Sequence, residues 1–128
     1  MTFDVPPGMP VPPRLPAPPV GEMSNSALAD LVRAGGPFRG KAVFELGDRA
    51  ATDDDAATVL GELTALPVVR DDRFHLVTLA WAAIVALLTA GTPHARQVAY
   101  QAFAGLPDSE QRDLLLYLHC DRIEDARP

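Results

Sequence analysis

The stretch that decides the fold is FHLVTLAWAAIVALLTAG, residues 74–91, in which nearly every side chain is apolar. Residues 76–95 contain no Asp, Glu, Lys or Arg. Plotted on a helix, the apolar positions fall on both sides: Leu76, Leu79, Ala80, Ala83 and Leu87 on one, and Val77, Trp81, Ile84 and Leu88 on the other. A helix that is apolar all round is buried all round, so we predict a central core helix over about 72–90.

The same stretch raises the alternative of a membrane-spanning helix, because it lies at the short end of the roughly 17–25 apolar residues that a span needs. Its composition argues against a span. It is rich in Ala rather than in Leu and Ile, it ends at Gly91-Thr92-Pro93, and its flanks lack basic clusters and aromatic belts. The sequence therefore favours a buried helix and disfavours a membrane as a partner.

Three amphipathic helices are predicted before the apolar stretch. The first, ALADLVRAG, follows three capping candidates, Ser24, Asn25 and Ser26, and stops at Gly35-Gly36-Pro37. The second runs over about 38–51, with Val43, Leu46 and Ala50 inward and Phe44 to the side. The third runs over about 53–66 behind a capping box of Thr52 and Asp55, with Val59, Leu60, Leu63 and Leu66 inward.

Two more helices are predicted after the apolar stretch. One begins at Pro93, a first-turn proline, and its inward face is Val98, Ala99, Ala102, Phe103 and Leu106. The other is capped by Asp108, with Gln111 three residues later. Its inward face is Leu114, Leu115, Tyr117 and Leu118. Its charged end after Cys120 is expected to fray. The prediction is an all-α protein: five or six antiparallel helices in a bundle or a short stacked helical-hairpin array, forming one domain over 23–128.

Composition supports this fold class and limits the partners. The 128 residues are 48% hydrophobic, 22% charged and only 6% aromatic, a mixture that suits helices better than sheets. The net charge of −6 comes without a basic patch, which disfavours nucleic acid as a partner. One cysteine, Cys120, excludes an internal disulfide, and the N-terminus lacks the basic and apolar regions of a secretion signal, so a cytoplasmic location is the default expectation.

Two segments forty residues apart look alike, since ALP ends at Pro67 and GLP ends at Pro107. Periods near 40–47 residues are typical of helical-hairpin repeats. The segment TPHARQVAYQAFAGL, residues 92–106, resembles the second helix of HEAT repeats, and residues 40–118 resemble them loosely. Five residues stand where that family commonly has proline, arginine, small residues and leucine: Pro93, Arg96, Ala99, Ala102 and Leu106. The resemblance implies stacked helical hairpins that serve protein–protein interaction.

No catalytic or metal-binding constellation emerges from the sequence. The acidic run at 52–55 suits a helix N-terminus, where carboxylates face the positive end of the dipole, better than a calcium loop. The histidines, His75, His94 and His119, form no helical metal-ligand pair. His119 adjoins Cys120, but helix neighbours point about 100° apart and do not form a nucleophile pair. We therefore predict no enzyme activity, no metal and no cofactor.

The first 22 residues form a proline-rich arm, with eight of the thirteen prolines in the first twenty positions. Such a segment is extended or disordered and has no internal hydrogen bonds. It serves either as a spacer or as a ligand for an aromatic-lined groove, because a pre-extended chain loses little entropy on docking. Two P-x-x-P motifs supply the candidate partner-binding residues: Pro10, Pro12, Pro13, Arg14, Leu15 and Pro16. A further alternative is that the arm packs on its own helices or on a second copy, anchored by Met9, Leu15 and Val20.

The functional hypothesis is a non-enzymatic protein–protein interaction module, an adaptor, accessory or regulatory subunit that uses the arm and a helical face to bind a protein partner or a second copy. One alternative is a small helical enzyme or small-molecule binder with a pocket beside Trp81, Tyr100 and His94. Another is an acidic inhibitor or immunity-type protein, for which the net charge of −6 is the motivation.

Overall fold

The computed structural model describes residues 17–74 and 77–128. The arm candidates Pro10, Pro12, Pro13, Arg14, Leu15 and Pro16, the anchor Met9, and His75 lie outside the described residues. The described part contains these elements: a 3-10 helix η1 (Val20–Glu22), α1 (Asn25–Arg33), α2 (Arg39–Arg49), α3 (Asp54–Leu63), α4 (Pro67–Arg70), strands β1 (Arg73–Phe74) and β2 (Val77–Thr78), α5 (Leu79–Ala90), α6 (Pro93–Ala104), α7 (Asp108–Tyr117) and a second 3-10 helix η2 (Ile123–Asp125).

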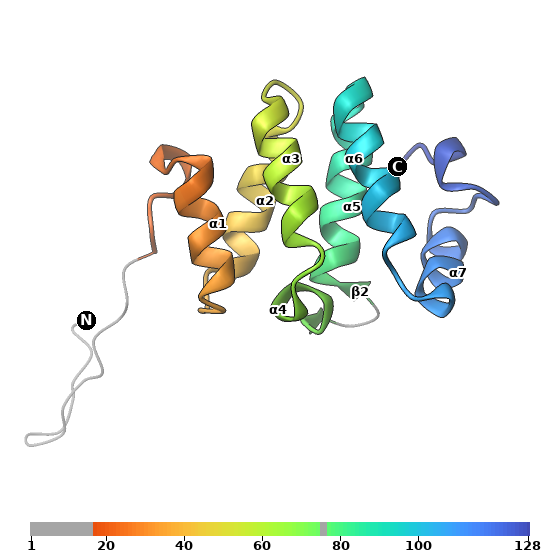
Figure 1. Cartoon of the computed structure of the whole chain (residues 1–128), viewed down its shortest axis with the longest axis horizontal. Coiled ribbons are helices and arrows are strands. Elements are labelled where there is room, and N and C mark those ends of the chain that lie inside the picture. Colours follow the sequence, from red (N-terminus) through yellow and green to blue (C-terminus); the bar gives the residue numbers. More distant parts are fainter. Residues whose placement is uncertain (1–16, 75–76) are drawn as a thin grey trace, which may run out of the picture.

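The long helices form two layers (Figure 1). Helices α1, α3 and α6 stand side by side in one layer, and α2 and α5 lie behind them in the other. Consecutive helices run antiparallel, and each of the helices α2, α3 and α5 packs against neighbours in both layers. The prediction of an all-α protein built from antiparallel helices is confirmed.

Helix α5 has more buried residues than any other helix of the described part, as predicted, but the other helices do not surround it. The five residues expected to be buried there, Leu79, Ala80, Ala83, Ile84 and Leu87, are at most 1% exposed. Burial does not extend all round the helix, however, and that part of the prediction is wrong. One stripe of α5, made of Ala82, Val85, Ala86 and Thr89, is only partly buried or exposed.

The apolar stretch does not begin as a helix. Residues 73–74 and 77–78 pair as a short antiparallel hairpin, Arg73 with Thr78 and Phe74 with Val77, so the predicted helix start at about 72 is wrong. The helix starts at Leu79 because the hydroxyl of Thr78 accepts a hydrogen bond from the Trp81 amide at 3.2 Å, which caps it. Gly91, with φ of +74°, ends the helix in the left-handed conformation that glycine adopts without strain.

Other helix ends also differ from the sequence prediction. Asp53, not Thr52, caps α3 by accepting from the Asp55 amide at 3.0 Å, and the helix ends at Leu63 rather than 66 because Pro67 starts the separate short helix α4. Helix α7 has no side-chain cap from Asp108. Gln111 instead donates to the Leu106 carbonyl at 2.9 Å, which joins α7 to the end of α6.

The C-terminal segment is packed rather than frayed, contrary to the prediction. Ile123 and Ala126 are 5% and 0% exposed. The Arg96 guanidinium donates to the carbonyls of Glu124 and Ala126 at 3.0 and 3.3 Å, and these bonds hold the segment against α6. Tyr117, predicted to point inward, is 59% exposed, because the inward position on this short helix is taken by Leu114, at 0%.

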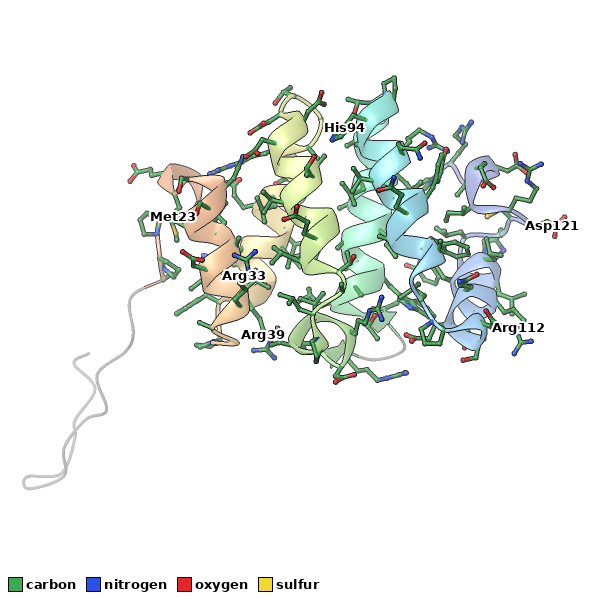
Figure 2. The ribbon with its side chains drawn as sticks, in the orientation of Figure 1. Met23, Arg33, Arg39, His94, Arg112 and Asp121 are labelled. Atoms are coloured by element: carbon green, nitrogen blue, oxygen red, sulfur yellow. The ribbon has the colours of Figure 1, made fainter. Side chains whose placement is uncertain are left out.

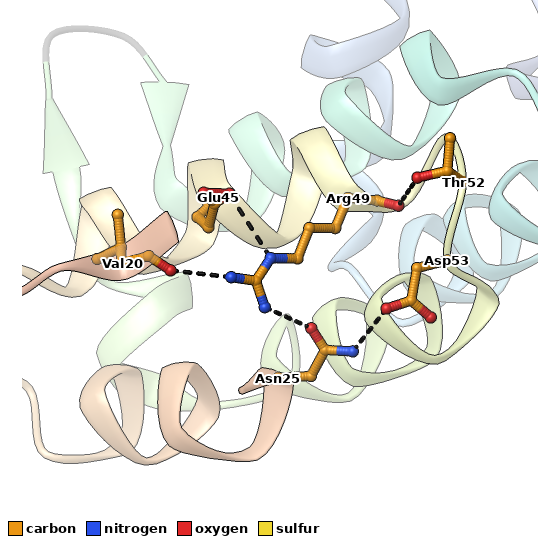
Figure 3. A network of polar contacts seen from close by, with 6 residues as sticks. All are labelled: Val20, Asn25, Glu45, Arg49, Thr52 and Asp53. Atoms are coloured by element: carbon orange, nitrogen blue, oxygen red, sulfur yellow. Dashed lines mark hydrogen bonds and ion pairs between the residues drawn. The ribbon is translucent and has the colours of Figure 1, made fainter. Parts of the chain in front are cut away.

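A polar network fastens the other end of the molecule (Figure 3). The Asn25 amide of α1 donates to the Asp53 carboxylate at 2.9 Å, and its carbonyl accepts from Arg49 of α2 at 3.0 Å. Arg49 also donates to the Val20 carbonyl at 2.9 Å and pairs with Glu45 at 3.6 Å. The extended conformation predicted through residue 22 is therefore wrong for η1, which is a turn held on α2.

Candidate functional site

An apolar groove with a volume of about 530 Å³ opens between α2, α5 and α7. Its lining residues come from three helices and one strand: Phe44, Gly47, Asp48 and Ala51 from α2 and its end, Val77 from β2, Trp81, Ala82, Val85, Ala86, Thr89 and Ala90 from α5, and Leu114 and Tyr117 from α7. We call this the α2/α5/α7 groove.

Helical spacing explains how the sequence builds the groove. On α2, positions 44, 47, 48 and 51 recur every three or four residues and so share one face. On α5, the partly exposed stripe has the same spacing and also faces the groove. Gly47 lets the two helices approach closely, because a Cβ added there would lie 2.8 Å from that of Ala86. Small residues thus make the floor.

Large aromatic side chains stand at the rim of the groove. Phe44 is 51% exposed and Tyr117 is 59% exposed, on opposite sides of the α5 stripe. Exposed aromatic rings beside an apolar floor are typical of binding surfaces rather than of a solvated face. The arrangement can hold an apolar segment and leave its polar edges in water.

The groove offers little polar chemistry. Asp48 is its only charged lining residue, and it makes no ion pair among residues 17–74 and 77–128. Trp81 is 7% exposed, and its indole Nε1 has no hydrogen-bond partner within the described part of the chain. The remaining lining residues are apolar or bear a hydroxyl group.

The structure separates the three residues of the alternative pocket. Trp81 lines the α2/α5/α7 groove, whereas Tyr100 and His94 are on α6 and do not line it. The Tyr100 hydroxyl accepts from Arg96 at 2.8 Å. His94 lies at the end of α6 beside α3 (Figure 2), where its Nε2 is 2.7 Å from the hydroxyl of Thr58. The expected constellation is therefore not assembled around one pocket.

The acidic run at the start of α3 serves to cap and fasten that helix. The hydrogen bond from Asn25 is the main reason that the pKa of Asp53 lies below its ordinary value, and the amides of Ala56 and Asp55 act in the same direction. In the described residues, no group of three or more His, Cys, Asp or Glu side chains is arranged to hold a metal ion. Nor does this part of the chain contain a helix long and apolar enough to cross a membrane.

Sequence reasoning missed the two rim residues as a site. Phe44 was placed beside the inward stripe of its helix, and Tyr117 was placed in the core. The signal that was available is the position of Phe44, since an aromatic side chain one residue away from a buried stripe must end at its edge. The exposure of Tyr117 depends on where α7 packs. That is a tertiary property, which a local sequence pattern does not predict.

No protein-family model matches this chain, and no curated protein or solved structure matches it either. The resemblance to HEAT repeats therefore remains a prediction from residues 92–106.

Proposed function

We propose that this protein is a non-enzymatic protein–protein interaction module that binds an extended, proline-containing segment of a partner in the α2/α5/α7 groove. The observation that carries the proposal is the apolar stripe of α5, left uncovered between two half-exposed aromatic side chains, Phe44 and Tyr117. An aromatic rim around an apolar floor is how proline-rich segments are recognised, because their rings pack on aromatic faces without losing much conformational freedom.

The dimensions of the groove support an extended ligand. The 12 residues of α5 span about 18 Å at 1.5 Å per residue. A polyproline II segment rises about 3.1 Å per residue, so about six residues cover that length. The small residues Gly47, Ala82 and Ala86 line the groove, and we take a slender extended chain as its ligand rather than a helix of about 10 Å diameter.

The polar groups of the groove favour binding over catalysis. Its titratable lining groups are one carboxylate, on Asp48, and one phenol, on Tyr117. General acid–base catalysis needs a positioned pair with complementary protonation states, whereas a lone acid in an apolar groove serves to orient a basic ligand. A small-molecule binder and an acidic inhibitor remain alternative proposals, for which Trp81 and the net charge of −6 are the respective motivations.

The test is a displayed peptide library selected on the full chain. We expect enrichment of proline-rich peptides with one basic residue, and loss of that enrichment in the Tyr117→Ser variant. The matched control is Leu116→Ser, which removes a neighbouring side chain that is 74% exposed on the same helix but does not line the groove. Enrichment that survives Tyr117→Ser, or no enrichment at all, would show that the groove does not bind such segments.

A further inference from the structure

We propose that the chain's own proline-rich arm occupies the α2/α5/α7 groove, so that a partner segment must displace it. This inference rests on the proposed function, since it names the segment that competes for the same groove. It makes the module self-inhibited, with an affinity for partners set by the arm.

The arm is fastened next to the groove. Arg49 holds the Val20 carbonyl at 2.9 Å, and Val20 packs against the core. Arg49 forms an ion pair with Glu45 beside this turn. Arg49 directly follows the groove-lining residue Asp48, and Glu45 directly follows the groove-lining residue Phe44. Successive residues of a helix are about 100° apart, so the anchor lies on the face of α2 that adjoins the groove.

The remaining chain is long enough to enter the groove. Residues 18–20 form a tight turn, in which the Val20 amide donates to the Pro18 carbonyl at 2.8 Å, so the reach comes from the sixteen residues before Ala17, about 50 Å if extended. Passing about 100° around a helix with a radius of about 5–6 Å takes about 10 Å. That passage and the roughly 18 Å of α5 together need about 28 Å, which is less than the arm supplies when extended.

The chemistry of the arm complements the groove. Arg14 is the only charged residue between Val5 and Val20, and Asp48 is the only charged residue that lines the groove. Prolines offer backbone carbonyls and no amide donors, whereas the unsatisfied polar atom of the groove wall is a donor, Trp81 Nε1. That atom is covered from solvent, so it meets a carbonyl only after the side chains above it move apart.

A proximity measurement on the full chain tests the arrangement directly. The fluorophore bimane is attached to a cysteine introduced as Val11→Cys, in a Cys120→Ser background that removes the chain's single native cysteine. Tryptophan quenches bimane on contact, and Trp81 is the chain's single tryptophan. We expect quenching that is lost in Trp81→Phe, weakened by Asp48→Arg and restored by adding Arg14→Glu. No quenching, or no response to the charge exchange, overturns the proposal. Quenching that fades on dilution also overturns it, since it would assign the arm to the groove of a second copy.

Competition separates this inference from the proposed function. Suppose that the free arm binds the groove with a Kd of about 0.1 mM and that the tether gives it an effective concentration of about 1 mM. A library peptide then binds about tenfold more tightly to a chain whose arm no longer binds the groove. We therefore expect Arg14→Glu to tighten that peptide about tenfold, with Asp4→Lys as the arm control that leaves its affinity unchanged. Equal affinity for the wild-type and Arg14→Glu chains would overturn self-inhibition and leave the proposed function standing. Absence of any Tyr117-dependent peptide would overturn both.

Discussion

The two sides of α5 are both almost entirely apolar, yet one is covered by other helices and the other is partly open. On one side, Ala80, Ala83 and Leu87 are 0% exposed because other helices cover them. On the other side, Ala82 and Val85 are partly exposed. The open side has the smaller residues, but both sides are apolar, so hydropathy does not distinguish the two stripes. The difference shows that closure of an apolar stripe depends on whether a neighbouring helix comes close enough to cover it.

A buried charge gives the largest test of this comparison. Ala83→Asp places an unpaired carboxylate on the closed side and costs several kcal/mol, against a total stability of about 5–15 kcal/mol, so we expect the variant to be unfolded or nearly so. Ala82→Asp, one residue away on the open side, should cost about 1 kcal/mol. Thermal unfolding followed by circular dichroism measures both. Equal losses would mean that the open side is as buried as the closed one.

Close packing of α3 against α6 gives the next test. A Cβ on Gly61 would clash with the Val98 side chain, so Gly61→Ala should cost about 1–3 kcal/mol through overpacking. Gly40→Ala, where a Cβ meets nothing within 4 Å, is the control and should be neutral or stabilise by up to about 1 kcal/mol. Urea unfolding gives the two free energies. A neutral Gly61→Ala would show that this seam is looser than the structure has it.

Acid should weaken the fastening of α1 to α3. The pKa of Asp53 is lower in the folded chain than in the unfolded chain, chiefly because Asn25 donates to its carboxylate. Its stabilising contribution is therefore present above the unfolded pKa of about 3.9 and is lost as the pH falls through the folded value. We expect Asn25→Ala to raise the pKa of Asp53, measured by carboxyl NMR, and to reduce the acid sensitivity of unfolding. An unchanged titration curve would contradict the assignment.

Removing rim side chains should have the smallest effect on stability. Tyr117→Ser and Leu116→Ser both truncate exposed residues of α7, so each should change the free energy of unfolding by about 0.5 kcal/mol or less. Denaturant midpoints of the two variants provide the measurement. A loss above about 2 kcal/mol for Tyr117→Ser alone would mean that this ring closes the core rather than bordering a groove.

Local patterns predicted most of the fold. The inward faces of the helices at 38–51 and from Pro93 came out as expected, with Val43, Leu46 and Ala99 fully buried, because amphipathic periodicity reports burial directly. Patterns failed where a distant partner decides the outcome. The hairpin before Leu79 and the exposure of Tyr117 depend on tertiary packing, and the bonds from Arg96 to the C-terminal segment join residues about thirty positions apart.

The groove was beyond sequence prediction for a related reason. An apolar helix reads as buried all round, and only the arrangement of α2 and α7 shows which stripe of α5 is left uncovered. Likewise, only the arrangement of the helices shows that Asp48 lines the groove. Conversely, the arm motif at residues 10–16 was visible in the sequence, but the groove was not.

The position of α5 along the chain has a consequence for synthesis on the ribosome. Helices α1, α2 and α3 are made first and pack on one another, but α2 and α3 also pack against α5, which follows α3 and three short elements. At about 5–20 residues per second, roughly 1–5 s pass between the end of α3 and the end of α5. During that interval the sides of α2 and α3 that α5 covers in the folded chain are open, so this is a stage at which a chaperone that binds apolar segments has surface to hold.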